Sequence, residues 1–166
     1  MTILGIDPGL GIIGYGVVKQ RKGGADFVAC GAITTAKDAQ VSDRLCEIYR
    51  DLNMLLTRFS PDAVAVEQLF FHQNQKTIIP VAEARGVILL ALAQANIPIY
   101  EYTPLQMKMT LTGYGRATKQ QIMEMTRLRL GLSALPKPDD AADALAIALC
   151  HSSAAESRLL TQKGNV

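Results

Sequence analysis

The sequence has few residues suited to covalent crosslinks and no stretch suited to a membrane. Its three cysteines, Cys30, Cys46 and Cys150, are odd in number and far apart, which argues against a disulfide framework and against a zinc site. No apolar run reaches the roughly 18 residues of a membrane span, and the N-terminus lacks the basic and then apolar pattern of a signal peptide. We therefore expect a cytoplasmic protein whose cysteines are small, buried apolar residues.

The chain also lacks repeats, low-complexity tracts and a strong excess of charge of either sign. Its 166 residues suit one domain with its own core, and 49% hydrophobic with 19% charged residues is a globular composition. We expect a single domain over residues 1–156 and a disordered tail over the polar residues 157–166. The net charge of +2 permits an anionic partner without requiring one.

Apolar patterning predicts both strands and helices. Five short apolar segments are expected to be strands: 3–6, 14–19, 27–34, 63–66 and 97–100. Four segments with helical spacing are expected to be helices: 45–59, 81–95, 118–130 and 139–155. Ser42 is available as a cap for the first helix, and Thr118 with Gln121 forms a capping box for the third. This order predicts an α/β fold with a mixed five-stranded sheet flanked by helices.

The predicted helix over 81–95 is apolar on nearly all sides. A helix of a small domain normally has one apolar stripe and one polar face, so this helix needs a second packing surface. We favour a homodimer formed through it, and burial within its own domain is the alternative. Pro80 is expected in the first turn of this helix or at a kink within it.

Asp7 lies where the first apolar segment ends, directly before Pro8 and Gly9. An aspartate here can simply start a turn by accepting a hydrogen bond from its own backbone. Glu67 ends another short apolar segment, where the ordinary interpretation is a solvated side chain. If these two strands are neighbours, both carboxylates emerge at one end of the sheet.

Two further carboxylates begin the last predicted helix. Asp140 and Asp143 are three residues apart and therefore lie on one helix face, after Asp139 as the expected N-cap. Acidic residues also favour a first helical turn for its dipole alone. The alanine-rich surface around them suits close packing on a sheet, which would carry both carboxylates towards Asp7 and Glu67.

Converging carboxylates raise one another's pKa unless a cation compensates their charge. Ligands that are all oxygen, with no nearby histidine or thiolate, suit Mg²⁺ or Mn²⁺. Magnesium held by few carboxylates keeps positions for water and phosphate oxygens, as two-metal phosphodiester cleavage requires.

The motifs together resemble the RuvC family of Holliday junction resolvases, which are crossover junction endodeoxyribonucleases. The resemblance covers about 2–151 and rests on the order and spacing of five segments: 5–9, 67–70, 83–87, 106–108 and 140–146. It implies an RNase H-like fold and a homodimer that nicks a four-way DNA junction symmetrically in DNA repair and recombination. It also implies about two Mg²⁺ ions per subunit, with Mn²⁺ able to substitute, and a branch-migration complex of the RuvA and RuvB type as partner. By matching motif, the catalytic, metal-binding residues would be Asp7, Glu67, Asp140 and Asp143, with Asp143 either on the metal or supporting a ligand.

Basic and aromatic residues form a candidate DNA surface. Arg116 and Lys119 flank the start of the Thr118 helix, where the helix dipole disfavours cations and an external anion explains them; ordinary solvated charges are the alternative. The resemblance adds Lys108 and Lys119 as phosphate contacts, which would position the DNA without reading its sequence. It also assigns Phe70 to stacking on an unpaired base.

Three other functions compete with a junction resolvase. A strand followed by Asp-x-Gly also opens the phosphate loop of actin-like kinases and ATPases, but those need two domains and 166 residues are too few. A nuclease of the same fold acting on another nucleic acid is the main alternative. A catalytically silent DNA-binding module would not need four carboxylates beside a polyanion.

Overall fold

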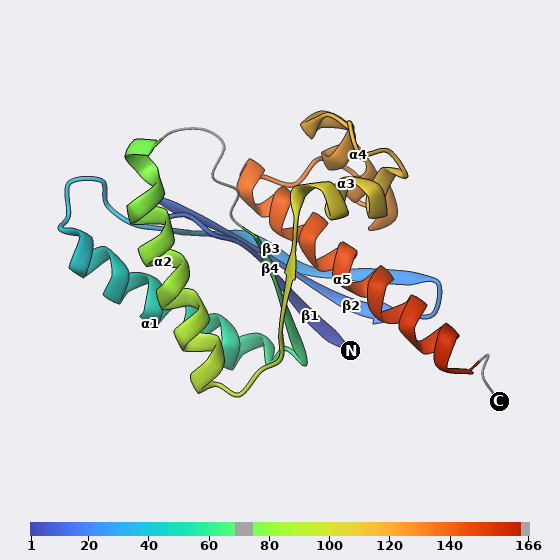
Figure 1. Cartoon of the computed structure of the whole chain (residues 1–166), viewed down its shortest axis with the longest axis horizontal. Helices are drawn as coiled ribbons and strands as arrows, with labels where there is room; N and C mark the ends of the chain where they lie inside the picture. The colour runs from blue at the N-terminus through green and yellow to red at the C-terminus, as the bar shows by residue number, and fades with distance from the viewer. Residues whose placement is uncertain (69–74, 164–166) are drawn as a thin grey trace.

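The computed structural model describes residues 1–68 and 75–163. It contains a five-stranded sheet of order β3-β2-β1-β4-β5 with helices on both faces (Figure 1). The strands are β1 (Thr2–Asp7), β2 (Ile12–Arg21), β3 (Gly24–Thr34), β4 (Ala63–Glu67) and β5 (Ile99–Tyr102). The helices are α1 (Val41–Phe59), α2 (Gln75–Gln94), α3 (Pro104–Thr112), α4 (Lys119–Arg129) and α5 (Asp139–Lys163).

The sheet is mixed, as the sequence predicts. β1, β2 and β3 form an antiparallel meander, whereas β1 pairs with β4 and β4 with β5 in parallel. Ile6 lies opposite Val66 in the β1–β4 ladder. The carboxyl ends of these two central strands therefore meet at one edge of the sheet.

Two hydrophobic cores lie on opposite faces of the sheet. One joins the sheet to α3, α4 and α5, and the other joins it to α1 and α2 (Figure 1). Ile3 belongs to the first core and Leu4 to the second, because successive side chains of a strand point to opposite faces. By the same alternation, Asp7 points to the α5 face. Glu67 also points there, since Ala65 packs on that side.

Glycines on the α5 face let this helix lie directly on the strands. A Cβ at Gly5 would meet the Ala144 carbonyl oxygen at 2.0 Å, and one at Gly14 would meet the Asp140 carbonyl oxygen at 1.9 Å. No side chain fits at either distance. The predicted close packing of the alanine-rich helix on the sheet is thus observed, and it involves the first turn of α5.

Several element boundaries differ from the prediction. Helix α3 was not expected, although Thr103 caps it with the same capping box that Thr118 gives α4. Helix α1 begins after Gln40, which makes no side-chain cap bond, so Ser42 is not its cap. The carbonyl of Pro138 accepts the first bonds of α5, which places Asp139 inside the helix rather than at its N-cap.

Three further expectations concern Pro80, the C-terminal segment and the cysteines. Pro80 lies inside α2, which begins earlier than predicted. Helix α5 continues to Lys163, so helical backbone covers most of the segment expected to be a disordered tail. Cys150 is buried, but Cys46 is exposed, contrary to the expectation for the cysteines. In the described ranges, no helix is long and apolar enough to cross a membrane.

Candidate active site

Asp7 and Glu67 come together because their strands are parallel neighbours. Ile6 and Val66 lie opposite each other in the β1–β4 ladder, and Asp7 and Glu67 are the next residues of their strands. Both strands are buried up to that pair, and both carboxyl-bearing residues are half-buried. Two short apolar strands that end in a carboxylate therefore place two acids side by side on the α5 face.

Gly14 brings the first turn of α5 to the same place. It lies opposite Asp7 in the β1–β2 ladder, and its Cα faces the Asp140 backbone so closely that a methyl group would overlap it. Asp140 and Asp143 are both half-buried in that turn. The three elements thus assemble the four predicted carboxylates at one edge of the sheet.

The electrostatics of Asp7 show how close the acids are. Burial, followed by the negative charge of Glu67 and a hydrogen bond with its side chain, raises the pKa of Asp7 from 3.8 to about 9. The charges of Asp143 and Asp140 raise it further. Asp7 is therefore protonated near neutral pH when no cation is bound, and its hydroxyl donates to Glu67.

Glu67 is the other partner in this hydrogen bond. Burial raises the pKa of Glu67, and the hydrogen bond from Asp7 opposes that effect because it stabilises the carboxylate. The charge of Asp143 raises the pKa, whereas Lys119 lowers it. In this pair, the Asp7 hydroxyl donates the hydrogen bond and the Glu67 carboxyl accepts it.

Lys119 lies among the carboxylates. Its Nζ is 2.9 Å from Asp143 Oδ2 and 3.9 Å from Asp139 Oδ2, and the hydrogen bond with Asp143 raises the pKa of Lys119. Lys119 is the first residue of α4, and the capping box of Thr118 sets where this helix begins. In that box the Gln121 amide donates to Thr118 Oγ1 at 3.3 Å, and the Thr118 amide donates to Gln121 Oε1 at 2.8 Å. The sequence predicted Lys119 as a DNA contact and did not predict this ion pair, which joins two separate helices.

The donor set suits a hard divalent cation. Over residues 1–68 and 75–163, no three His, Cys, Asp or Glu side chains form a group that could hold a metal ion as they stand. A shared proton and an ammonium group compensate the negative charge instead. Carboxylate oxygens such as these are the ligands that Mg²⁺ and Mn²⁺ prefer in proteins, and a bound cation would compensate the same negative charge.

The other predicted DNA contacts lie on α3 and beside α4. Lys108 is half-buried on α3, and Arg116 is exposed just before α4. Neither residue forms an ion pair in the described part of the chain. Phe70 lies outside the described residues.

Sequence reasoning missed the role of Gly14. A glycine inside a strand often marks a close approach of another backbone, and Gly14 and Gly16 alternate along β2 as residues of one face do. A Cβ at Gly16 would lie 2.6 Å from the Leu145 amide nitrogen. This pattern could have identified the strand on which α5 rests.

The mixed sheet, with its antiparallel meander and its parallel strands β4 and β5 crossed by α5, is the RNase H-like fold of nucleases. Residues 3–151 match the family model described as crossover junction endodeoxyribonuclease RuvC. The chain belongs to the RuvC family, whose members are metal-dependent nucleases.

Individual relatives are similar to this protein in sequence and structure along most of the chain. The crossover junction endodeoxyribonuclease RuvC of Caldicellulosiruptor saccharolyticus is 51% identical over 91% of this chain and 92% of its own length. The RuvC of Thermotoga petrophila is 50% identical over 99% of this chain and 100% of its own length. The structure of Thermus thermophilus RuvC in complex with a Holliday junction substrate is 37% identical, has a TM-score of 0.89, and covers 95% of this chain and 96% of that one.

Proposed function

We propose that this protein is a Holliday junction resolvase, a structure-selective endonuclease that makes symmetric paired nicks in four-way DNA junctions during recombination and repair. The observation that carries the proposal is the group of carboxylates at Asp7, whose pKa is raised by burial and by three neighbouring acids. Family membership and the junction complex of the Thermus relative support the substrate.

The carboxylates would act as a binding site for two Mg²⁺ ions, which Mn²⁺ could replace. When bound, the metal supplies an activated water and stabilises the leaving 3′ oxygen. Asp7 lies between Glu67 on β4 and the first turn of α5, which supports it as the residue that would hold both ions. Glu67 and Asp140 would each hold one of them. Asp143 would either join them or support a ligand.

The basic residues would hold the DNA backbone over this site. Lys119 already lies 2.9 Å from Asp143, and Lys108 and Arg116 carry cations without protein partners in the described residues. Such cations fit phosphate contacts. Phe70, which follows the Glu67 strand in sequence, would stack on an unpaired base near the crossover.

A homodimer through α2 would supply the second nicking site. The inner face of α2 is buried at Ala84, Ile88, Ala91 and Leu92. The opposite stripe is apolar yet exposed: Ile79 is 69% exposed and Leu90 is 53% exposed, and a Cβ at Gly86 would meet nothing within 4 Å. An exposed apolar stripe on a helix fits a partner subunit, as symmetric cleavage requires.

The proposal extends to the cellular setting by family resemblance alone. We expect a branch-migration complex of the RuvA and RuvB type to deliver the junction, and a cytoplasmic location. The single domain over residues 1–156 would carry the whole activity.

Competition between substrates tests the proposal. With Mg²⁺, the protein is expected to cut a mobile synthetic four-way junction at paired, symmetric sites while leaving linear duplex of the same sequence intact. Equal cleavage of duplex, or preference for an RNA-containing hybrid, would instead favour an RNase H-like nuclease with another substrate. No cleavage, together with binding that Mg²⁺ does not alter, would favour a silent binding module.

A further inference from the structure

Arg44, in the first turns of α1, lies beside the loop that directly follows Asp7. A Cβ built on Gly11 of that loop would be 3.4 Å from Arg44 Nη2. The loop and the end of β3 are tied together, because the Thr35 amide donates to the Gly11 carbonyl at 3.1 Å. The guanidinium therefore lies over a loop residue that has no side chain to cover it.

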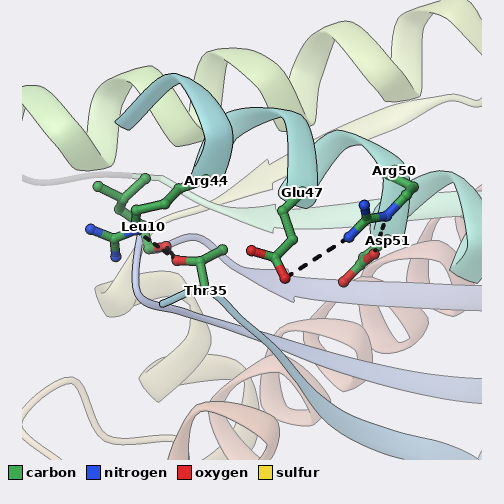
Figure 2. A network of polar contacts seen from close by, with 6 residues as sticks. All are labelled: Leu10, Thr35, Arg44, Glu47, Arg50 and Asp51. Carbon is green, nitrogen blue, oxygen red and sulfur yellow. Dashed lines mark hydrogen bonds and ion pairs between the residues drawn. The ribbon is translucent and has the colours of Figure 1, made fainter. Parts of the chain in front are cut away.

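A buried hydroxyl fixes the orientation of this guanidinium. Arg44 Nε donates to Thr35 Oγ1 at 2.9 Å, and that hydroxyl donates to the Leu10 carbonyl at 2.6 Å (Figure 2). Thr35 is only 7% exposed. The chain of two hydrogen bonds holds one nitrogen of Arg44 and connects it to the loop that continues from Asp7.

The other two nitrogens of Arg44 have no acceptor in the described part of the chain. Arg44 forms no ion pair there, although acidic residues lie on the same helix: Glu47 and Asp51 pair with Arg50 instead, at 3.9 and 3.2 Å. In Figure 2 the Arg44 guanidinium points away from that group of charges. A guanidinium carries five N–H donors in a planar fork that matches the oxygens of a phosphate.

The position of Arg44 suits a phosphate of the strand held at Asp7. Gly11 follows Asp7 by four residues, and four residues span at most about 14 Å. Since one DNA strand advances about 3.4 Å per nucleotide, Arg44 would lie within a few nucleotides of a phosphate bound at Asp7.

Arg44 also lies on the opposite flank from Lys119. Lys119 begins α4, which packs on the α5 face, while α1 packs on the other face. We propose that Arg44 binds a backbone phosphate of the DNA strand that is cut, a few nucleotides away from the phosphate at Asp7. Thr35 would act as a positioning residue that orients its guanidinium. This inference rests on the proposed function.

Replacing Arg44 with Gln tests the contact, and Arg50→Gln is the matched control because it removes the same charge from the same helix. Junction binding is measured in chelator at several salt concentrations. We expect Arg44→Gln to weaken binding about tenfold, as the removal of one charge-assisted hydrogen bond predicts. It should also reduce the slope of log K against log salt by about 0.9 for each phosphate that the variant no longer neutralises. Arg50→Gln is expected to change neither value.

Two further variants separate binding from folding. Arg44→Lys keeps the charge, so it should retain the wild-type salt slope even where affinity falls. Thr35→Val keeps the shape and removes the orienting hydroxyl, so it should weaken binding less than Arg44→Gln does. Wild-type affinity and slope in Arg44→Gln, or equal losses in Arg44→Gln and Arg50→Gln, would overturn the inference. A wild-type protein that neither binds nor cuts the junction would instead refute the proposed function.

Discussion

Replacing Gly14 with Ala is expected to separate the carboxylates of the proposed catalytic site. The added methyl carbon would lie 1.9 Å from the Asp140 carbonyl oxygen and 3.0 Å from Asp140 Cβ. Because both neighbours belong to the helix itself, no side chain can rotate away, and the start of α5 must move by about 1 Å. A displacement of this size at a catalytic group lowers a rate by about 10²-fold.

The assay is the single-turnover rate of nicking with protein in excess over a synthetic four-way junction and Mg²⁺ saturating. Overpacking is also expected to lower the free energy of unfolding by about 1–3 kcal/mol, so two controls are needed. Ile48→Val removes a methyl from the core on the opposite face and costs about 1 kcal/mol, yet it should nick at the wild-type rate. Gly24→Ala adds a methyl whose nearest atom is 3.7 Å away, so it should change neither quantity.

The pattern among these variants decides the question. A loss of rate in Gly14→Ala without a matching loss in Ile48→Val would show that α5 must touch β2 for Asp140 to reach Asp7. Gly14→Ala with wild-type nicking and wild-type stability would refute this reasoning, since the methyl group would then have been accommodated without moving the helix.

Three other predictions follow from the charges and surfaces of the site. Because the folded protein holds a proton on Asp7 up to a pKa of about 9, while the unfolded chain releases it near 3.8, the stability of the metal-free protein should fall as pH rises from about 5 towards 9. In thermal unfolding, the Asp7→Asn variant should show a smaller fall and a higher melting temperature than the wild type at pH 8. Added Mg²⁺ should raise the melting temperature of the wild type at that pH. Identical pH profiles for both proteins would contradict the interaction of Asp7 with its neighbouring acids. Lys119→Ala should weaken junction binding and flatten its salt dependence, and unchanged binding at every salt concentration would remove Lys119 from the DNA surface. Leu90 lies on the exposed stripe of α2, and Leu90→Glu should convert the proposed dimer into folded monomers in sedimentation experiments. Paired nicking should then be lost. A dimer that persists in this variant would show that the interface lies elsewhere.

The sequence was enough to predict the strands that carry Asp7 and Glu67. Each strand is a short apolar run that ends in a carboxylate, and such runs are local signals. The Thr118 capping box was predictable for the same reason, since its two residues are three apart. These features require no knowledge of how distant segments meet.

Features that depend on distant segments were not predictable in the same way. Helix α3 buries only Met107 and Leu111, which gave too little apolar periodicity, although Thr103 and Gln106 repeat the capping signal of α4. The Lys119 ion pair with Asp143 joins α4 to α5, and the contact of Gly14 with Asp140 joins β2 to α5. The alternation of Gly14 and Gly16 marks β2 as a strand that another backbone approaches, but it does not specify which residues of α5 meet it.

The most direct test of the active site compares wild-type protein with Asp7→Asn on one four-way junction. Junction binding in chelator and nicking after addition of Mg²⁺ are measured on the same samples. The assigned role of Asp7 predicts that the variant binds the junction at least as well as the wild type, since one negative charge beside the DNA is gone, and that it makes no nicks. Nicking by Asp7→Asn at the wild-type rate would contradict the assignment of this carboxylate group as the catalytic site.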